Sequence, residues 1–586
     1  MFLLQVPYEV GIVRQFPFTS TLQRMSVVCR TLGRRYMDLY AKGAPEMIHS
    51  LCDPATVPEN YFDVLRGYTL QGFRVMALAY RPLEKKLTWH HVQRWLYYRD
   101  QVECNLTFLG FLIMQNMLKL ESTPVIHTLH NACIRCLMVT GDNLWTAISV
   151  ARDCDMIAST VRVVVVKASI NPGSSMATLE FEEACRADEI SSSRSFRACI
   201  GDKYIEMEEN SNFQFAVDGR SFAIIRHHFP DIFEKLLVRG TVFARMLPDQ
   251  KMQLVQHLQQ LGYVVGMCGD GANDCGALKA ADVGISLSEA ESSVAAPFTS
   301  KVPNIQCVPT VIREGRCALA TSFSMFKFIS LYSLIQFLSV MLLYYVQTNF
   351  SDGMFLYVDL FVITTLAVTM SYAEPCTELV AGRPQSSLVS QSNITSLLLQ
   401  LIIVIVGQVG MLKYLQSQPW YSRPNHDPEE DVYNYWDTAT LFFVSCYQYL
   451  IMAVVFSTGP PFQKPLWSNF WFLGNLVVLF CFTTFLLFQA FPSVKGFFDM
   501  VRWRSEEKIH FRMTILMVCG LSWIFSHVVE EYVINSAMLK RAYRALVPKP
   551  APKNRYKVVE LEIIQDPSWL APKTTVLKHF DDFPKS

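Results

Sequence analysis

The pattern of apolar and polar positions changes sharply near residue 315. Before that point, short apolar runs typical of buried strands alternate with amphipathic stretches, which predicts an α/β fold with parallel strands. Residues 161–166 and 263–268 have the composition of buried strands. Residues 249–261 carry apolar positions at helical spacing. We therefore expect a cytosolic-type α/β region in the first half of the chain.

After residue 315 the sequence contains six long apolar runs. Each is close to the roughly 20 residues that cross the hydrocarbon core of a bilayer. They cover residues 318–346, 354–372, 394–414, 436–456, 470–491 and 514–534. Buried helices of a large soluble protein are the alternative, but protein alone would hardly cover six such runs. The sequence thus predicts a multi-pass membrane protein that contacts lipid.

The basic residues predict the orientation in the membrane. An even number of spans places both ends of the membrane region on one side. The segment after Ile534 is rich in Lys and Arg, which the positive-inside rule assigns to the cytosol. Basic residues between 502 and 512 would face the other side and disagree with this orientation. We expect the α/β region and both ends of the chain to be cytosolic.

Composition supports the membrane prediction and does not favour a nucleic-acid partner. Only 18% of the residues are charged, compared with about a quarter in a typical soluble domain. The formal net charge of +1 does not favour nucleic acid as a partner. Nothing in the composition indicates the oligomeric state.

The strongest chemical signal is the segment 269–286, which follows an apolar strand and opens a helix. Asp270 and Asp274 flank a tight turn whose glycines let the backbone approach closely. Two carboxylates so placed can hold Mg²⁺ beside a phosphoryl group, and Asn273 can donate to a phosphate oxygen. The alternative is a solvated acidic turn before a helix.

Two further segments fit phosphate chemistry. Thr140, Gly141 and Asp142 follow a second apolar strand, and open α/β sheets bind ligands at the carboxyl ends of their strands. In the third segment, which begins at Phe243 and includes Arg245, Lys251 begins a helix and offers a positive charge. Alone, a Gly-Asp turn is common and a single lysine is more often solvent-facing.

In this order and spacing, the three segments resemble the haloacid-dehalogenase phosphotransferase core and, more narrowly, the phosphorylation domain of P-type ATPases. Residues 42–46 (Lys-Gly-Ala-Pro-Glu) resemble that family's nucleotide-domain motif. The resemblance implies that Asp270 and Asp274 bind Mg²⁺ and that Thr140 and Lys251 are catalytic. It also implies an ATP site formed by Phe18, Lys42, Arg74, Thr140, Gly141, Asp142, Arg245, Lys251 and Asn273.

The membrane half resembles the type V subfamily of P-type ATPases, most closely its B branch of polyamine pumps in endosomes and lysosomes. Residues 332–336 (Tyr-Ser-Leu-Ile-Gln) and 358–365 carry this likeness. Asp359 is an ionisable group inside a span, which is a functional-site hypothesis by default. The resemblance implies that Asp359, Tyr332 and Gln336 contact a transported cation. The alternative is an ordinary interhelical hydrogen bond.

Three elements of that family do not occur in this sequence: Asp-Lys-Thr-Gly-Thr, which carries the phosphorylated aspartate, Thr-Gly-Glu-Ser and Pro-Pro-x-x-Pro. The resemblance therefore implies the C-terminal portion of an ATP-driven cation or polyamine pump, inactive by itself and missing the first strand of its phosphorylation domain. We expect unpaired sheet edges as a consequence. The alternatives are a non-enzymatic nucleotide-binding regulator of a full-length pump and a membrane-anchored phosphatase.

The resemblance also predicts a division of the chain into four parts. Residues 1–115 form a partial nucleotide-binding domain and residues 116–315 form the phosphorylation domain. Residues 316–536 form six transmembrane helices, and residues 537–586 form a basic cytosolic tail.

Overall fold

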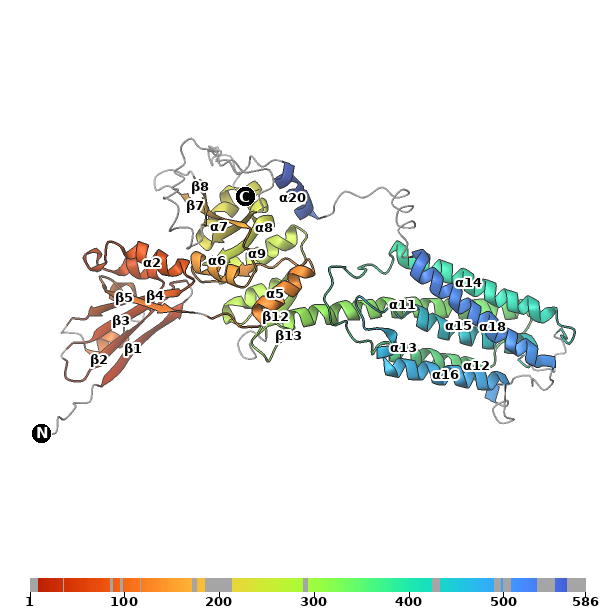
Figure 1. The fold of residues 1–586 in the computed structure, drawn as a ribbon. Coiled ribbons are helices and arrows are strands. Elements are labelled where there is room, and N and C mark those ends of the chain that lie inside the picture. The colour runs from red at the N-terminus through yellow and green to blue at the C-terminus, as the bar shows by residue number, and fades with distance from the viewer. Residues whose placement is uncertain are drawn as a thin grey trace, which may run out of the picture. The chain divides into compact units, whose positions relative to one another are not determined.

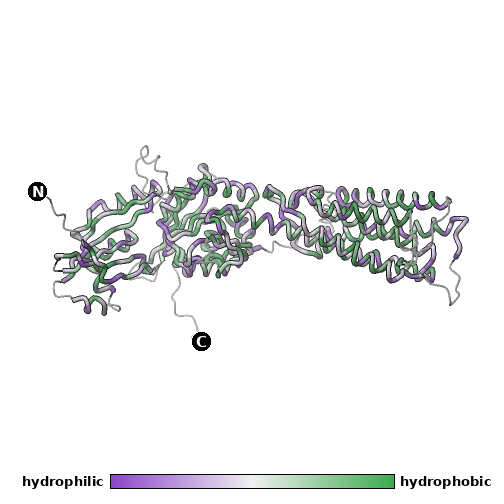
Figure 2. Tube along the Cα trace, turned by 90° about the horizontal axis from the view of Figure 1, so that it is seen from below, coloured by the Kyte–Doolittle hydropathy of each residue, from purple (hydrophilic) through white to green (hydrophobic). Residues whose placement is uncertain are grey.

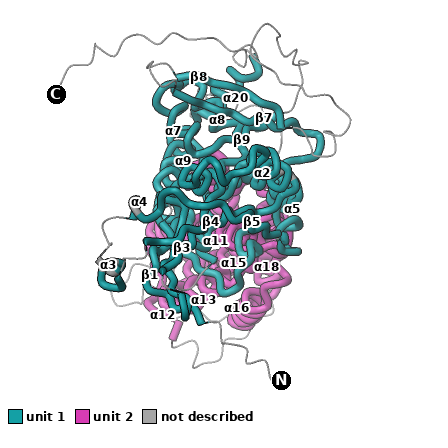
Figure 3. The backbone as a smooth tube through the Cα atoms, turned by 90° about the vertical axis from the view of Figure 1, so that its left-hand side faces the viewer, with its two compact units in different colours: residues 1–130, 134–308, 551–586 teal, residues 131–133, 309–550 magenta. Residues whose placement is uncertain are grey.

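The protein consists of two compact units, each with its own hydrophobic core. The computed structural model describes residues 9–19, 21–34, 36–84, 88–94, 99–115, 117–170, 177–184, 213–287, 294–423, 433–488, 497–498, 507–534 and 554–565. Unit 1 comprises residues 1–130, 134–308 and 551–586, and unit 2 comprises residues 131–133 and 309–550 (Figure 3).

Unit 1 begins with a five-stranded antiparallel sheet in the order β1-β2-β3-β4-β5. Its strands are β1 (Val10–Thr19), β2 (Arg24–Thr31), β3 (Asp38–Gly43), β4 (Arg74–Pro82) and β5 (Thr107–Met114). Its helices are α1 (Pro45–Leu51), η1 (Pro54–Thr56), α2 (Tyr61–Leu70), α3 (Trp89–Arg94) and α4 (Arg99–Val102). The expectation of parallel strands was wrong for this sheet. Only four positions of the sequence separate β1 from β2, and only antiparallel neighbours accept so short a connection.

The second sheet of unit 1 is mostly parallel, as predicted, and has the order β6-β10-β9-β7-β8. Its strands are β6 (Met138–Val139), β7 (Arg162–Ile170), β8 (Ala177–Glu183), β9 (Phe213–Asp218) and β10 (Gly240–Ala244). Only β8 runs antiparallel, at one edge. The accompanying helices are α5 (Ser122–Asn131), α6 (Leu144–Asp153), α7 (Gly219–His228), α8 (Pro230–Arg239) and α9 (Pro248–Gln260). Strand β10 is buried along its whole length, as expected for a parallel strand covered on both faces.

A third, smaller parallel sheet carries the acidic turn. It consists of β11 (Gly266–Gly269), β12 (Val283–Ser286) and β13 (Phe298–Thr299), with η3 (Ala272–Asp274) and α10 (Cys275–Ala280) between the first two strands. Among the described strands, β11 pairs with β12 alone and β6 pairs with β10 alone. The two strands that precede the candidate phosphate loops therefore each have one unpaired edge within the described residues.

A helix that the sequence analysis did not predict lies within the basic tail. It is α20 (Arg555–Gln565), which packs beside α8 in unit 1 (Figure 1). Val559 and Ile563 enter the core of the second sheet. Tyr556 stacks on Tyr263 with ring centroids 4.1 Å apart. The segment is therefore part of the folded unit.

Unit 2 is helical, and its helices are predominantly hydrophobic (Figure 2). They are α11 (Cys307–Val346), α12 (Asp352–Leu356), η4 (Tyr357–Ile363), α13 (Thr364–Met370), α14 (Gln391–Gln416), α15 (Trp436–Phe456), η5 (Leu466–Ser468), α16 (Phe470–Phe488), α18 (Glu507–Val528) and η6 (Val529–Ile534). Within the described residues, six helical stretches are long and apolar enough to cross a membrane. The prediction of a six-helix membrane region is confirmed, and the chain is a multi-pass membrane protein.

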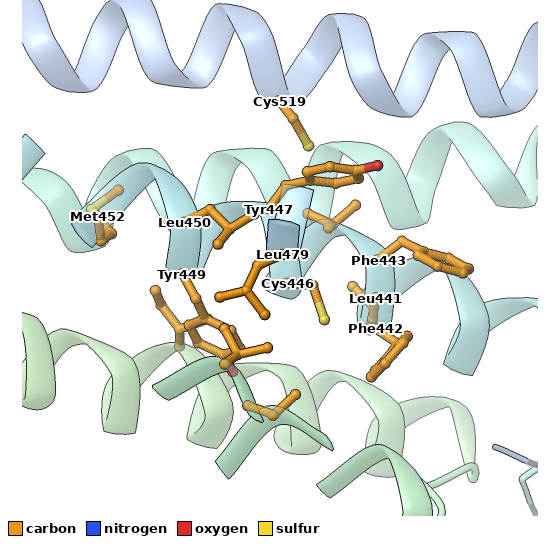
Figure 4. Close-up of a cluster of buried hydrophobic side chains, with 14 of the residues drawn as sticks. Leu441, Phe442, Phe443, Cys446, Tyr447, Tyr449, Leu450, Met452, Leu479 and Cys519 are labelled. Carbon is orange, nitrogen blue, oxygen red and sulfur yellow. The ribbon is translucent and has the colours of Figure 1, made fainter. Parts of the chain in front are cut away.

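Helix α15 is the centre of unit 2. Of its most apolar stretch 94% is buried, compared with 17% for the last span. Phe442, Tyr447 and Tyr449 of α15 pack against neighbouring helices, including Leu479 of α16 and Cys519 of α18 (Figure 4). The outer helices instead expose large apolar side chains such as Phe337, as lipid-facing helices do.

Candidate functional site

In the turn after β11, the side chain of Asp274 lies close against the backbone of Gly269. A Cβ atom on Gly269 would lie only 2.7 Å from Asp274 Oδ2, so the carboxylate occupies space that any other residue at position 269 would fill. The Asp274 amide donates to the carbonyl of Gly271 at 3.0 Å. Asp274 is 9% exposed, whereas Asp270 and Asn273 are exposed. The turn thus presents one buried and one accessible carboxylate.

Lys251 reaches Asp274 from the first turn of α9. Its Nζ donates to Asp274 Oδ1 at 2.7 Å, and the two side chains are only 11% and 12% exposed. Pro248 begins the helix, and the Leu247 amide donates to Gln250 Oε1 at 3.0 Å. This capping arrangement fixes the start of α9. The two predicted residues are thereby brought together, although 23 positions separate them.

The loop after β6 is tied to the end of β10 by backbone hydrogen bonds. The Thr140 amide donates to the Phe243 carbonyl at 2.9 Å, and the Arg245 amide donates to the Asp142 carbonyl at 3.0 Å. The Asp142 amide in turn donates to Thr140 Oγ1 at 3.1 Å. Asn143 then caps α6 by accepting from the Trp145 amide. The hydroxyl of Thr140 is therefore held at the carboxyl end of a parallel strand.

Two ion pairs connect the nucleotide-type segments with this loop region of unit 1. Arg74 Nε lies 3.5 Å from Asp142 Oδ1, and an Arg245 side-chain nitrogen lies 2.9 Å from Glu46 Oε2. Glu46 also accepts from Asn143 Nδ2 at 3.1 Å. Sequence reasoning did not select Glu46 as a site residue. Its place as the last residue of the Lys-Gly-Ala-Pro-Glu motif was the signal that could have identified it.

Phe18 and Lys42 lie on the antiparallel sheet. Phe18 of β1 is 58% exposed, and Lys42 of β3 is also exposed. Lys42 pairs with Met25 of β2, and Phe18 lies across β2 in the irregular end of the β1–β2 ladder. An exposed aromatic ring and an exposed ammonium group are thus separated by one strand. Among the described contacts, none joins these residues, or Thr140, to Asp270.

The two carboxylates of the acidic turn are enough to hold Mg²⁺ only if phosphate oxygens and waters supply the other ligands. Asp270 and Asp274 supply two carboxylates, and the described residues contain no group of three His, Cys, Asp or Glu side chains that could hold a metal ion. Mg²⁺ typically keeps several waters and binds through one or two carboxylates plus phosphate oxygens. Burial, with smaller contributions from the Cys307 thiol and the two aspartates, raises the pKa of Cys268 to about 12. That thiol is therefore protonated at physiological pH when no metal ion is bound.

The candidate cation site of unit 2 centres on a π-helical turn. Asp359 lies in η4, exposed, and accepts a hydrogen bond from the hydroxyl of Tyr332 on α11. Thr364 Oγ1 donates to the Asp359 carbonyl at 2.6 Å. Tyr332 also packs edge-on against Tyr449 of α15. Gln336 is half-buried one turn further along α11. Single π-helical turns are frequent at functional sites.

Comparison with known proteins shows which family this chain is similar to. The family model described as "P-type ATPase, cytoplasmic domain N" matches residues 5–121. Polyamine-transporting ATPase 13A3 of Homo sapiens is 44% identical over 604 residues, which cover 98% of this chain and 49% of that protein. Over almost its whole length, this chain is similar to P-type ATPases. The resemblance drawn from the sequence motifs is thereby confirmed.

Two further relatives of this chain have similar coverage. Polyamine-transporting ATPase 13A2 of Homo sapiens is 42% identical, over 96% of this chain and 47% of that protein. Probable cation-transporting ATPase 13A4 of Gallus gallus is 40% identical, over 96% of this chain and 48% of that protein. The chain thus spans about half the length of the curated relatives that it matches.

Proposed function

We propose that this chain is the portion of an ATP-driven cation pump that binds nucleotide, stabilises the transferred phosphate and carries six membrane helices. The observation that supports this most directly is the buried contact of Lys251 with Asp274 in the turn after β11. A phosphate site requires a positive charge and a metal-holding carboxylate within reach of one another. The two segments that supply them here are distant in sequence and meet at the carboxyl side of a parallel sheet.

Each residue of the phosphate site has a distinct role in this proposal. Lys251 neutralises charge on the phosphate, and the hydroxyl of Thr140 and the amide of Gly141 donate to its oxygens. Asp270 and Asp274 hold Mg²⁺, which supplies charge neutralisation on the transferred group when bound. Asn273, exposed between them, donates to the same group. Because Asp274 already binds Lys251, the lysine is held beside the proposed metal-holding turn.

The nucleophile is not among the residues of this chain, because no Asp-Lys-Thr-Gly-Thr occurs in the sequence. In the proposal it arrives on a further parallel strand that pairs with the open edges of β6 and β11. A strand placed there would end beside the loops that carry Thr140 and Asp270, since carboxyl ends of parallel strands share one edge. The chain by itself therefore transfers no phosphate, while keeping the groups that stabilise it.

The antiparallel sheet provides the adenine site in this proposal. The exposed ring of Phe18 stacks on the base, and Lys42 lines the same surface. Arg74 and Arg245 reach the phosphates from positions already linked to Asp142 and Glu46. These ion pairs hold the two guanidinium groups close to the loop of Thr140.

The transported cation is a polyamine in this proposal. The names of two relatives state polyamine transport, and Asp359 offers an exposed carboxylate within a candidate span. The hydroxyl of Tyr332 fixes one carboxylate oxygen, and Gln336 adds an uncharged hydrogen-bonding group on the same helix. We place the α/β unit in the cytosol and the membrane region in an endosomal or lysosomal membrane.

Nucleotide binding tests the proposed function. Replacing Phe18 by alanine removes the stacking surface and should weaken the binding of ATP to the purified chain by about 5- to 150-fold, the cost of one base–aromatic stack. Phe62, which is 52% exposed on α2, is the matched control, and Phe62→Ala should leave the affinity unchanged. The measurement is competition of ATP with a fluorescent ATP analogue. Equal affinities of the two variants, or no nucleotide binding by the chain, would overturn the proposal.

A further inference from the structure

An ion pair joins two candidate membrane spans of unit 2. Lys327 Nζ of α11 lies 2.7 Å from Glu530 Oε1 of η6, and the side chains are 12% and 18% exposed. Both residues lie inside stretches apolar enough to cross a membrane. Charged side chains in such segments are costly, and their presence there points to a function.

A serine from a third span forms hydrogen bonds to both charged groups. Ser396 Oγ of α14 accepts from Lys327 Nζ at 3.2 Å and donates to Glu530 Oε2 at 2.7 Å. The ring of Phe456, at the end of α15, lies 5.2 Å from the same ammonium nitrogen. Both charges thus have hydrogen-bonding partners, and such a network of buried polar groups favours one arrangement of the helices. The three residues tie α11, α14 and η6 together.

This cluster and the candidate cation site lie on opposite faces of α11. At 3.6 residues per turn, Gln336 lies about 180° around the helix axis from Lys327, and Tyr332 about 140°. The contacts agree with this geometry, because Tyr332 binds Asp359 of η4 whereas Lys327 binds α14 and η6. One face of α11 is therefore held by the ion pair of Lys327, and the opposite face carries Tyr332 and Gln336 of the candidate cation site.

We propose that Lys327, Ser396 and Glu530 form a charge lock, which fixes the rotation of α11 about its axis and so positions Tyr332 and Gln336 for the cation. The lock rests on the proposed transport function for its purpose, though not for its existence. Lys327 and Glu530 are positioning residues, since they act on the cation through α11. The π-helical turn η6, which contains Glu530, aims its carboxylate at α11 and α14.

Loss of either charge should allow α11 to rotate about its axis. Neutralising either partner leaves the other buried without its counter-ion, which is far more costly than removing or exchanging both. A lone lysine side chain relieves that cost by turning toward the membrane surface, and α11 then rotates with it. Exchanging the two charges keeps the attraction and should keep the helix in place.

The first experiment decides whether the pair is coupled. The thermal unfolding midpoint of the full chain in detergent is measured for Lys327→Met, Glu530→Gln, the double variant and the exchanged pair Lys327→Glu/Glu530→Lys. Each single variant should lower the midpoint more than the double variant does, and Glu531→Gln should leave it unchanged. Glu531 is the matched control, because it is adjacent and exposed. Additive effects of the two single variants would overturn the lock.

The second experiment decides whether the lock positions the site. The affinity of radiolabelled spermine for the chain in nanodiscs should fall by about 2- to 30-fold in each single variant, the range expected for coupling through a packed network. It should return toward the original value in the exchanged pair. Unchanged affinity in the single variants, or no recovery in the exchanged pair, would overturn positioning. If the unaltered chain binds no spermine, the proposed substrate fails, and the unfolding midpoints alone decide the lock.

Discussion

The proposed phosphate site of unit 1 depends on contacts between side chains that are distant in the sequence. The contact of Lys251 with Asp274 is buried, so each charge depends on the other for its compensation. Breaking a buried pair costs more than the pair contributes, because the remaining charge stays desolvated. The same contact therefore links the proposed catalytic role of Lys251 to the stability of the turn after β11.

The variant Lys251→Met tests this link. It should destabilise unit 1 by about 3 kcal/mol, because Asp274 keeps its burial and loses its counter-charge. Lys279→Met is the control, since Lys279 of α10 is exposed near the same turn and surface changes usually stay within about 0.5 kcal/mol. Denaturant unfolding of the chain measures both. Equal stability of the two variants would show that the pair carries no compensation.

The candidate site residues could be selected from the sequence, but the contacts between them could not. Asp270, Asp274, Lys251 and Thr140 could be selected because strand-end carboxylates, hydroxyls and lysines fit phosphate chemistry in that order. The sequence could not show that Arg245 binds Glu46, since 199 positions separate them. The partner of Lys327 lies 203 positions away and was missed for the same reason. Contacts between elements follow from the three-dimensional arrangement, which local patterns do not encode.

At the scale of elements, the membrane helices were predictable, whereas the strand direction was predicted correctly for the second sheet and wrongly for the first. The apolar runs alone define the spans, because lipid imposes one length and one composition. Parallel and antiparallel strands share the same local composition, so the first sheet was predicted with the wrong direction. Helix α20 was missed because its basic residues suggested a solvated tail, whereas its buried face is only a few apolar positions wide.

The packing of α20 gives a sharp test between neighbouring residues. Ile563 is 5% exposed and Ile564 is 64% exposed. Ile563→Ala should destabilise unit 1 by about 2–4 kcal/mol, because it leaves a cavity in the core of the second sheet. Ile564→Ala should cost less than about 0.5 kcal/mol. Thermal unfolding of the chain measures both, and equal midpoints would show that α20 does not dock in solution.

At the scale of the whole molecule, chemistry and transport are assigned to different units. Unit 1 holds the candidate nucleotide and phosphate residues, and unit 2 holds the candidate cation site with its charge lock. Strands β6 and β11 each have one unpaired edge within the described residues, next to the loops of Thr140 and Asp270. The proposed phosphate acceptor therefore lies on a strand that enters between these edges.

Covalent phosphorylation tests this central claim most directly. The purified chain is incubated with γ-labelled ATP and Mg²⁺, quenched with acid and assayed for bound label. The account predicts no label on the chain alone. It predicts a hydroxylamine-sensitive label once the chain is joined to the part of a polyamine-transporting relative that it does not span. Label on the chain alone, or none on the joined protein, would contradict the account.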